Sequence, residues 1–449
     1  MVKENKKITL WSGKIPFIKE MKEFYSKINY KGINLWPIMA SEVYTYYENP
    51  EKEKLIKILS ILKYLFTQDK FEIKGDKNKI FVSYIMARKD HHVLMKKALE
   101  KFSKEELTWL DAYSYKIKKP LLKYSYLIPN IFLLFKIHYL FKKNKFKELK
   151  GWMKWHFIAR TYFRYNQIKQ FQKIYTKYKP KAYIGFCSQA FPEETIFTLI
   201  CKKNKIPTFT LQHGFVLEHK KFSPNTTLLE NNVSDYNLVW GIETEKIIKK
   251  HSKNTKTILV GNPKYAFTEK KDKKNFNPVQ GSVFLSVIGH GNSNKNFMKV
   301  INDFALKNSK IIFNVKKHPF DDWENYKEII NSKNINLIAN DEQIPKLLEK
   351  SDFVLLHNTT IAMEALLYQI PTIYFNDKNS AFLWKNEDRF KKGIELENLF
   401  KKLKDNKVLE KWLKLYRKEL DKKFYFHPTK SVPEIYHEKI KEVIKKFNK

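Results

Sequence analysis

The stretch SDFVLLHNTTIAMEALLYQIPTIYF, residues 351–375, decides the fold. Its apolar run DFVLL has the length of a strand and ends in His357, Asn358, Thr359 and Thr360. The helical pattern IAMEALLYQ follows at once, and a second apolar run, PTIYF, comes next. A strand, a helix and a strand in this order predict a βαβ unit, and such units build a parallel sheet.

The same alternation extends outward from this stretch in both directions. Apolar runs of strand length recur at residues 79–85, 181–187, 206–212, 236–240, 257–260, 283–288, 310–316 and 335–339. A polar segment, residues 264–282, separates the earlier runs from the later ones and reads as an interdomain linker. The alternation predicts an α/β protein. We expect two domains, since 449 residues exceed the roughly 250–300 that one hydrophobic core supports.

The predicted domains are residues 1–268, residues 282–425 and a basic C-terminal helix at 426–449. Residues 105–179 of the first domain show a helical, aromatic and basic pattern with no clear strand, so we expect a helical insertion there. The run INLWPIM, residues 33–39, predicts a short strand.

The charge of the chain points to anionic partners. Lys and Arg number 86 against 47 Asp and Glu, a formal net charge of +39, which suits nucleic acid, anionic lipid or phosphorylated substrates. A lysine bias in the encoding genome is the alternative explanation. The apolar stretch 126–141 is interrupted by Pro129, Lys136 and His138, so we expect a core or membrane-surface helix rather than a spanning one. With two cysteines in no metal spacing and no secretory leader, a cytoplasmic location is expected.

Polar clusters follow four of the predicted strands directly. In open parallel sheets, ligands bind beyond the carboxyl ends of the strands, so we expect these clusters to line one side of a cleft between the two domains. The clusters are Gln212-His213-Gly214, Gly289-His290-Gly291-Asn292-Ser293, Lys316-Lys317-His318 and His357-Asn358-Thr359-Thr360.

The clusters of the second domain are candidates for binding the phosphates of a nucleotide. The loop from Gly289 to Ser293 offers backbone N–H donors at a helix start, and Lys316 and His318 offer positive charge. Asn358, Thr359 and Thr360 stand where a helix begins, and Glu364 lies one turn after Thr360, where it could accept hydrogen bonds from ribose hydroxyls. Ordinary turns, a solvated basic strand end and a capped helix are the structural alternatives.

His213 is the candidate catalytic residue of the first domain. A neutral imidazole near pH 7 can accept a proton from a hydroxyl or donate one to a leaving phosphate. The alternative is a core histidine satisfied by a backbone group. Glu193 and Glu194 are rival carboxylate bases. The sequence shows no set of metal ligands, so we expect a metal-independent reaction and no cofactor besides the nucleotide-sugar substrate.

The motifs LQHG, GNP, KKHP and SD…HNTT…MEAL…IPTIYF, in this order across residues 181–376, resemble those of bacterial GT-B glycosyltransferase-like proteins of surface and capsular polysaccharide synthesis. The HP and HNTT pair resembles the enzymes that use cytidine-activated donors, namely the Kdo, sialyl, polysialyl and CDP-glycerol transferases. The resemblance implies two Rossmann-like domains whose parallel sheets face each other across a cleft.

The resemblance also implies a function. The chain would be a transferase that moves a sugar or polyol phosphate from a CMP- or CDP-linked donor to a surface polysaccharide or lipid-linked glycan. It would act in the cytoplasm, peripherally at the inner face of the plasma membrane, on an anionic surface. The QHG and GNP motifs also resemble UDP-GlcNAc 2-epimerase-like proteins, which is the alternative. A nucleic-acid-binding protein is a remote alternative, because no RNP, KH or helix-turn-helix pattern is present.

Overall fold

The computed structural model divides into two compact units. Unit 1 comprises Met1–Ala266 and Tyr425–Lys449, and unit 2 comprises Phe267–Phe424. The structure describes residues 15–48, 64–65, 71–85, 88–111, 131–149, 151–214, 216, 228–263, 276–286, 291–318, 321–357, 359, 361–377, 388–423 and 429–447.

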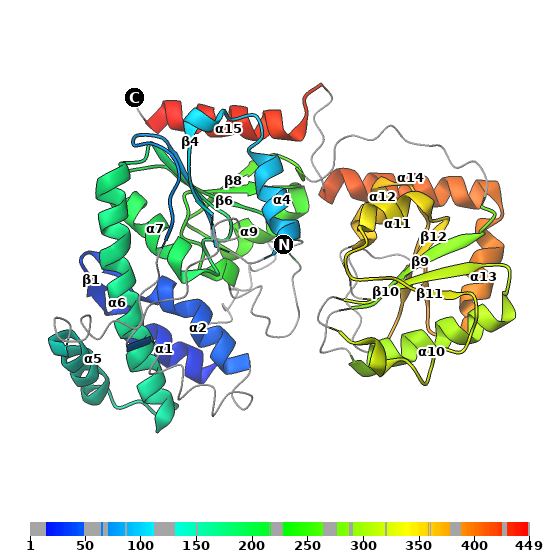
Figure 1. Cartoon of the computed structure of the whole chain (residues 1–449), viewed down its shortest axis with the longest axis horizontal. Helices are drawn as coiled ribbons and strands as arrows, with labels where there is room; N and C mark the ends of the chain where they lie inside the picture. Colours follow the sequence, from blue (N-terminus) through cyan, green and yellow to red (C-terminus); the bar gives the residue numbers. More distant parts are fainter. Residues whose placement is uncertain are drawn as a thin grey trace, which may run out of the picture. The chain divides into compact units, whose positions relative to one another are not determined.

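Unit 1 is built on a six-stranded parallel sheet. The strands in chain order are β3 (Ile80–Tyr84), β4 (Leu107–Asp111), β5 (Ala182–Gly185), β6 (Thr208–Leu211), β7 (Tyr236–Val239) and β8 (Lys256–Leu259). Their order across the sheet is β4-β3-β5-β6-β7-β8 (Figure 1). The chain therefore moves outward from β3 to β4 and then crosses to β5, so the order reverses between β3 and β5. Ligands bind at such switch points in doubly wound sheets.

The helices of unit 1 cover this sheet and extend beyond it. They are α1 (Pro16–Ser26), α2 (Trp36–Glu48), α4 (Lys89–Ala98), α5 (Ile131–Lys143), α6 (Trp152–Tyr178), α7 (Pro192–Lys203), α9 (Ile242–His251) and α15 (Val432–Phe447), with a short 3₁₀ helix η2 (Lys104–Glu106) and a hairpin of β1 (Asn29–Tyr30) and β2 (Ile33–Asn34). Helices α1, α2, α6 and α7 share one hydrophobic core with the sheet. The long helix α6 thereby ties the sheet to α1, α2 and α5 (Figure 1).

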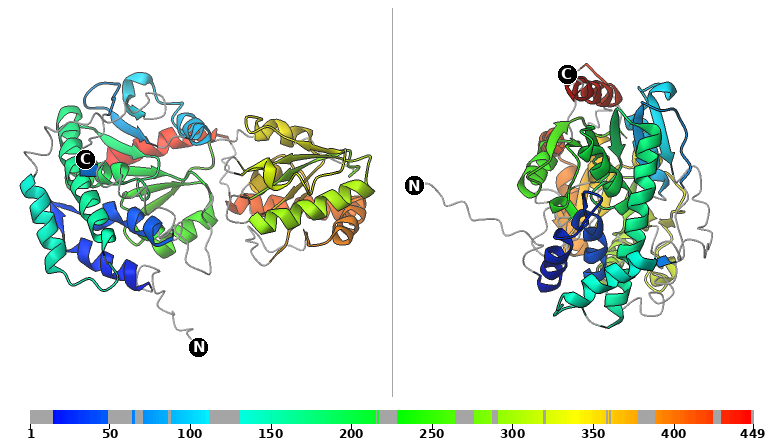
Figure 2. Two further views of the ribbon diagram at one scale, coloured as in Figure 1. Left: turned by 60° about the horizontal axis from the view of Figure 1, so that its bottom comes forward. Right: turned by 90° about the vertical axis from the view of Figure 1, so that its left-hand side faces the viewer.

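Unit 2 is a second doubly wound parallel sheet. Its strands are β9 (Gln280–Phe284), β10 (Ile312–Lys316), β11 (Ile335–Leu337), β12 (Phe353–Leu356), β13 (Thr372–Phe375) and β14 (Arg389–Phe390), in the order β11-β10-β9-β12-β13-β14. The order reverses between β9 and β12. Helices α10 (Gly291–Lys307), α11 (Ile344–Lys350), α12 (Ile361–Leu367), α13 (Gly393–Leu403) and α14 (Asn406–Lys423), with the 3₁₀ helix η5 (Trp323–Asn325), enclose both faces (Figures 1 and 2).

The predicted α/β class with two parallel sheets is confirmed. The strands expected at 79–85 and from residue 181 onward are present. The apolar runs of β3, β5, β6 and β12 are buried inside the sheets, whereas β8 and β11 lie at sheet edges and are partly exposed. Two doubly wound units are the components of the GT-B-like fold expected from the motifs. That the two sheets face each other stays a prediction.

Two local predictions are wrong. The run INLWPIM contributes only Ile33–Asn34 to a strand, and helix α2 begins at Trp36. The Asn34 side chain accepts the Trp36 N–H at 3.0 Å and Pro37 occupies the first turn, two features that start helices. Within the segment predicted as helical, Leu107–Asp111 forms β4, since its residues pair along β3 and are mostly buried.

The C-terminal helix α15 belongs to unit 1. The buried Tyr436 hydroxyl donates to the carbonyl oxygen of Gly261 at 3.3 Å, and Lys441 forms an ion pair with Glu106 beside β4. Ile435, Tyr436 and Ile440 are buried. The chain therefore leaves unit 1 after Ala266, forms unit 2, and contributes to unit 1 again from Tyr425 onward.

Gly281 in β9 lies in a tightly packed part of the unit 2 sheet. A Cβ placed there would lie 2.2 Å from the ring of Phe353, its partner in β12, and that ring is packed against Phe313 and Phe400. We expect Gly281→Ala to lower the free energy of unfolding by about 1–3 kcal/mol in urea titrations, the usual cost of overpacking. Gly393→Ala is the control, because a Cβ there meets no atom within 4 Å. Equal stabilities for the two variants would refute this packing.

Candidate functional site

The carboxyl edge of the unit 1 sheet gathers titratable and aromatic side chains. Parallel strands end at the same edge, so Asp111 at the end of β4, Phe186 after β5 and His213 after β6 lie along it. His92 in the first turns of α4 pairs with Asp111, with 2.7 Å between Nε2 and Oδ2. This edge includes the switch point between β3 and β5, where a ligand is expected.

Gln212 fixes the backbone on either side of His213. Its Oε1 accepts the Trp240 N–H at 2.7 Å, and its Nε2 donates to the Gly214 carbonyl at 3.0 Å and to the Thr244 hydroxyl at 3.2 Å. A buried side-chain amide that spans β6, β7 and α9 in this way holds the loop in one conformation. The residue before the histidine is therefore structural.

His213 itself is half-buried among rings. Its ring centroid lies 5.6 Å from His91 and 5.3 Å from Phe186, and its Nε2 lies 3.8 Å from the Cys187 sulfur. Burial lowers the pKa of His213 to about 4; a backbone hydrogen bond with Leu211 opposes this shift, and Arg88 adds to it. The imidazole is neutral at pH 7, which is the state in which a histidine can accept a proton.

Glu194 lies directly beneath this edge. It is in the first turn of α7 and is buried, and its Oε2 accepts the Cys187 N–H at 2.6 Å. Burial raises the pKa of Glu194 to about 8, although the hydrogen bonds from Cys187 and Ser83 lower it. The carboxyl is mostly protonated at neutral pH and holds the strand-end residues in place.

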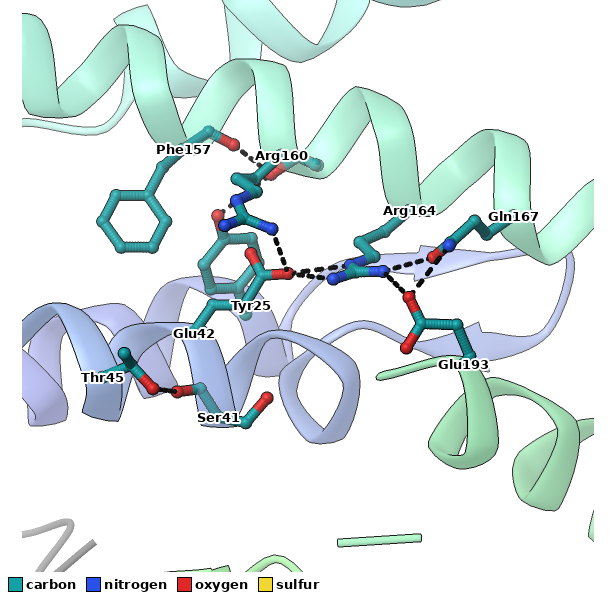
Figure 3. A network of polar contacts seen from close by, with 10 residues as sticks. Tyr25, Ser41, Glu42, Thr45, Phe157, Arg160, Arg164, Gln167 and Glu193 are labelled. Carbon is teal, nitrogen blue, oxygen red and sulfur yellow. Dashed lines mark hydrogen bonds and ion pairs between the residues drawn. The ribbon is translucent and has the colours of Figure 1, made fainter. Parts of the chain in front are cut away.

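Glu193, one residue earlier, belongs to a buried network of charges (Figure 3). Its Oε1 accepts from Arg164 Nη1 at 2.7 Å and from Gln167 Nε2 at 3.0 Å. Arg164 also donates through Nε to Glu42 Oε1 at 2.8 Å, and Arg160 reaches the same oxygen at 3.3 Å. Burial raises the pKa of Glu193, but Arg164 and Gln167 outweigh it and hold that pKa below its ordinary value. The network joins α2, α6 and α7.

The switch point of unit 2 has a floor of buried polar side chains. Ser286 after β9 donates its hydroxyl to Asn294 Oδ1 at 2.8 Å, and Asn294 Nδ2 donates to the Ser286 carbonyl at 3.2 Å. His357 after β12 places Nδ1 3.3 Å from both Ser286 Oγ and Asn294 Oδ1, and its Nε2 lies 3.4 Å from Asp377 Oδ1. His357 is fully buried, so it supports the site from below.

Some of the predicted phosphate-binding residues lie at the start of the helices that follow this floor in the chain. Gly291, Asn292 and Ser293 form the first turn of α10, where Ser293 is buried and Asn292 exposed. Thr359 Oγ1 accepts the Ile361 N–H at 3.4 Å and so caps α12 as predicted, and Glu364 is half-buried on that helix. The remaining predicted residues Gly289, His290, Asn358 and Thr360 lie outside the described residues.

The basic residues after β10 are engaged in local structure. Lys316 Nζ donates to the carbonyls of Ala339 and Asn340 at 2.8 and 3.2 Å, and burial lowers its pKa. Lys317 donates to the Asp321 carbonyl at 2.5 Å, and His318 is half-buried beside it. Lys316 therefore fastens the loop that follows β11.

Sequence reasoning missed Ser286, Asn294, Arg164 and Asp111. Asp111 could have been found, because it is a polar residue directly after the run LTWL, whereas Ser286 stands inside the apolar run predicted at 283–288. Arg164 gave no signal, since a basic residue in a lysine-rich helix looks like a solvated one. Across the described ranges, no three His, Cys, Asp or Glu side chains are grouped so that they could hold a metal ion.

No protein-family model matches the chain, and no curated protein matches it in sequence. Solved structures resemble it at low identity. UDP-GlcNAc 2-epimerase from Neisseria meningitidis bound to UDP-GlcNAc is 13% identical over 82% of this chain and 100% of that one, with a TM-score of 0.43. MnaA of S. aureus with UDP is 14% identical over 83% and 97%, with a TM-score of 0.49. A TarM variant of S. aureus with alpha-GlcNAc-glycerol and UDP is 12% identical over 63% and 59%, with a TM-score of 0.43.

Removing the guanidinium of Arg164 from the charge network should lower the free energy of unfolding. Arg164→Met leaves the carboxylates of Glu42 and Glu193 buried without their main partner, so the free energy of unfolding should fall by about 3–5 kcal/mol. The control is Lys401→Met, which removes an exposed pair with Glu397 and should cost at most about 1 kcal/mol. Chemical denaturation of both variants checks this, and a loss for Arg164→Met as small as the control's would show that the network contributes little.

The two pKa values of Glu194 predict a pH dependence. Its pKa is raised from 4.5 to about 8, so between these values the unfolded chain releases the proton while the folded chain keeps it. Stability from this group is therefore full below about pH 4.5 and is lost as pH rises to about 8.

The test compares the wild type with Glu194→Gln, which keeps a hydrogen-bond donor and acceptor but does not titrate. The stability difference, wild type minus variant, should fall by a few kcal/mol across that window, since one pKa unit corresponds to about 1.4 kcal/mol. Urea titrations at several pH values measure it, and a difference that is constant with pH would contradict a buried, protonated Glu194.

Proposed function

We propose that the chain is an enzyme acting on a nucleotide-sugar, with unit 2 binding the nucleotide. The observation that carries this proposal is the switch point between β9 and β12, where Ser286, Asn294 and His357 form a buried polar floor beside the first turn of α10. Backbone N–H groups at the start of a long helix suit a diphosphate. Ser293, Thr359 and Glu364 are the described side chains proposed to contact the nucleotide.

His213 is the proposed acid–base residue. Its low pKa keeps the ring neutral, and it lies at the carboxyl edge of the unit 1 sheet, where the enclosing rings of His91 and Phe186 exclude water from two sides. Glu193 is bound by Arg164, and Glu194 is buried beneath Cys187. These two carboxyl groups support the site, and His213 supplies the proton transfer.

The first candidate activity is epimerisation of a UDP-sugar at carbon 2. The histidine of the HNTT motif, on which the likeness to cytidine-using transferases depends, is buried against Ser286 and Asn294. The QHG motif at residues 212–214 and the GNP motif at residues 261–263, which also resemble those of UDP-GlcNAc 2-epimerase-like proteins, both lie in unit 1. In this reaction the proton at carbon 2 is removed as the bond from carbon 1 to UDP breaks, which leaves UDP and a sugar with a double bond between carbons 1 and 2. A proton from solvent then adds to carbon 2 on the opposite face as UDP returns to carbon 1, so the reaction needs acid–base chemistry and no acceptor.

Sugar transfer is the second candidate. It would move a sugar from a nucleotide, CMP- or CDP-linked by the motif resemblance, to a lipid-linked glycan at the cytoplasmic face of the membrane. The observation that favours it is an exposed aromatic and basic helix in unit 1, α5. Surface or capsular polysaccharide would be its product class.

Solvent exchange separates the two activities. UDP-GlcNAc incubated with the enzyme in D₂O, with no acceptor, should gain deuterium at carbon 2 and yield the C2 epimer, both visible by NMR. The exchange should survive EDTA, because the reaction is proposed to need no metal. No deuterium at carbon 2, together with tighter binding of CMP or CDP than of UDP, would favour transfer instead.

His213→Asn should slow this exchange about 10²–10⁴-fold, the usual contribution of a general acid–base group. Its melting temperature and its affinity for UDP should stay near those of the wild type, because His213 lies in unit 1 and is half-buried. His437→Asn, on α15 against Phe102, is the control histidine and should keep full exchange. A destabilised but fully active His213→Asn would show that this ring is only a packing residue.

A further inference from the structure

Helix α5 presents large aromatic side chains to the solvent. Phe132, Phe135 and Tyr139 are 82%, 64% and 62% exposed, and Trp155 at the start of α6 is 52% exposed. We call Phe132, Phe135, Lys136, Tyr139, Lys143 and Trp155 the aromatic–basic face. Soluble proteins seldom leave such a cluster uncovered unless it binds something.

The spacing along α5 puts these residues on one side. Residues 132, 135, 136, 139 and 143 follow the i, i+3, i+4, i+7 pattern of a single helix face. The opposite side is anchored: Ile137 and Phe141 are buried, and the Phe141 ring packs on Phe24 with 4.7 Å between centroids. Helix α5 lies against α6 (Figure 1), so the aromatic–basic face points away from the core.

Trp155 packs on the side of α5 next to the other residues of this face. Its ring stacks on His138 of α5, with centroids 5.0 Å apart and an interplanar angle of 26°. The contact connects the start of α6 with the middle of α5. The exposed rings thus come from two packed helices, which makes a broad surface of fixed shape.

The charge along α5 has one sign. Residues 131–147 contain five lysines and no Asp or Glu, and Lys136, Lys142 and Lys143 are exposed. Lysines near an anionic bilayer each contribute about 1 kcal/mol of attraction, and aromatic rings are favoured at the level of the lipid headgroups. A second copy of this face would bring like charges together. A soluble polyanion could bind the lysines, but it would leave the aromatic rings exposed to water.

We propose that the aromatic–basic face docks the protein on an anionic lipid bilayer, with the rings at the headgroup level and the lysines against lipid phosphates. Among the helices that the structure describes, none has the length and hydropathy of a membrane span. This inference goes beyond the proposed reaction and does not depend on which sugar chemistry the enzyme performs.

The test is sedimentation of the full chain with vesicles of phosphatidylglycerol and phosphatidylcholine, or of phosphatidylcholine alone. The wild type should bind the anionic vesicles and release them as salt rises. Phe132→Ala/Phe135→Ala/Tyr139→Ala should bind at least about tenfold more weakly. Lys136→Gln/Lys142→Gln/Lys143→Gln should bind about 100-fold more weakly, which corresponds to about 1 kcal/mol per lysine.

Matched controls separate docking from general effects. Leu306→Ser/Ile394→Ser/Leu415→Ser removes three exposed apolar side chains of unit 2 and should bind vesicles like the wild type. The aromatic variant should keep wild-type binding to heparin, a soluble polyanion. Brominated phosphatidylglycerol should quench tryptophan fluorescence in the wild type and less in Trp155→Phe.

The proposal is overturned if the aromatic variant binds anionic vesicles as tightly as the wild type. It is also overturned if the wild type sediments as a dimer that this variant dissociates, because the face would then bind a second copy. Failure of the carbon 2 exchange would leave vesicle binding unaffected, so the two proposals fail separately.

Discussion

The candidate site of unit 1 depends on the ion pairs that the buried guanidinium of Arg164 forms with Glu42 and Glu193. This guanidinium joins Glu42 of α2 and Glu193 of α7 to the long helix α6, three elements that are far apart in sequence. Fixing the first turn of α7 also fixes Glu194, whose carboxyl accepts the Cys187 N–H. Cys187 and Phe186 in turn contact His213. The pairing of β5 with β6 aligns the two strand ends, and this ionic anchor connects α2 and α6 to the residues that follow β5.

Neighbouring carboxyls in α7 have opposite ionisation because they face different surroundings. Successive helical residues point about 100° apart, so Glu193 meets Arg164 and Gln167 while Glu194 is directed to the strand ends. The guanidinium holds the pKa of Glu193 low, whereas burial raises that of Glu194 to about 8. Unit 1 thus contains an ionised structural carboxylate at Glu193, a protonated carboxyl at Glu194 and a neutral imidazole at His213, each set by its own surroundings.

The two units use the edge of a parallel sheet in different ways. In unit 2 the edge carries small polar groups, with Ser286 and Asn294 hydrogen-bonded around a buried His357, which suits the binding of a polar ligand. In unit 1 the edge carries rings and titratable groups, which suits chemistry. Lys316 shows that a basic residue after a strand need not contact a phosphate, since its ammonium group secures the carbonyls of Ala339 and Asn340.

The sequence by itself determined the features that arise from local pattern: alternating strands and helices, two parallel sheets, the cap at Thr359 and the placement of His213 after a strand. These follow from apolar periodicity and from turn and cap residues, which act over a few positions. Only the tertiary structure decided that Leu107–Asp111 is a strand, because its pairing with β3 supplies the hydrogen bonds. It also decided that Glu193 binds Arg164, that His357 is buried beneath the polar groups of unit 2 and that α15 belongs to unit 1. Those roles depend on partners distant in the chain, and local composition carries no record of which groups folding brings together.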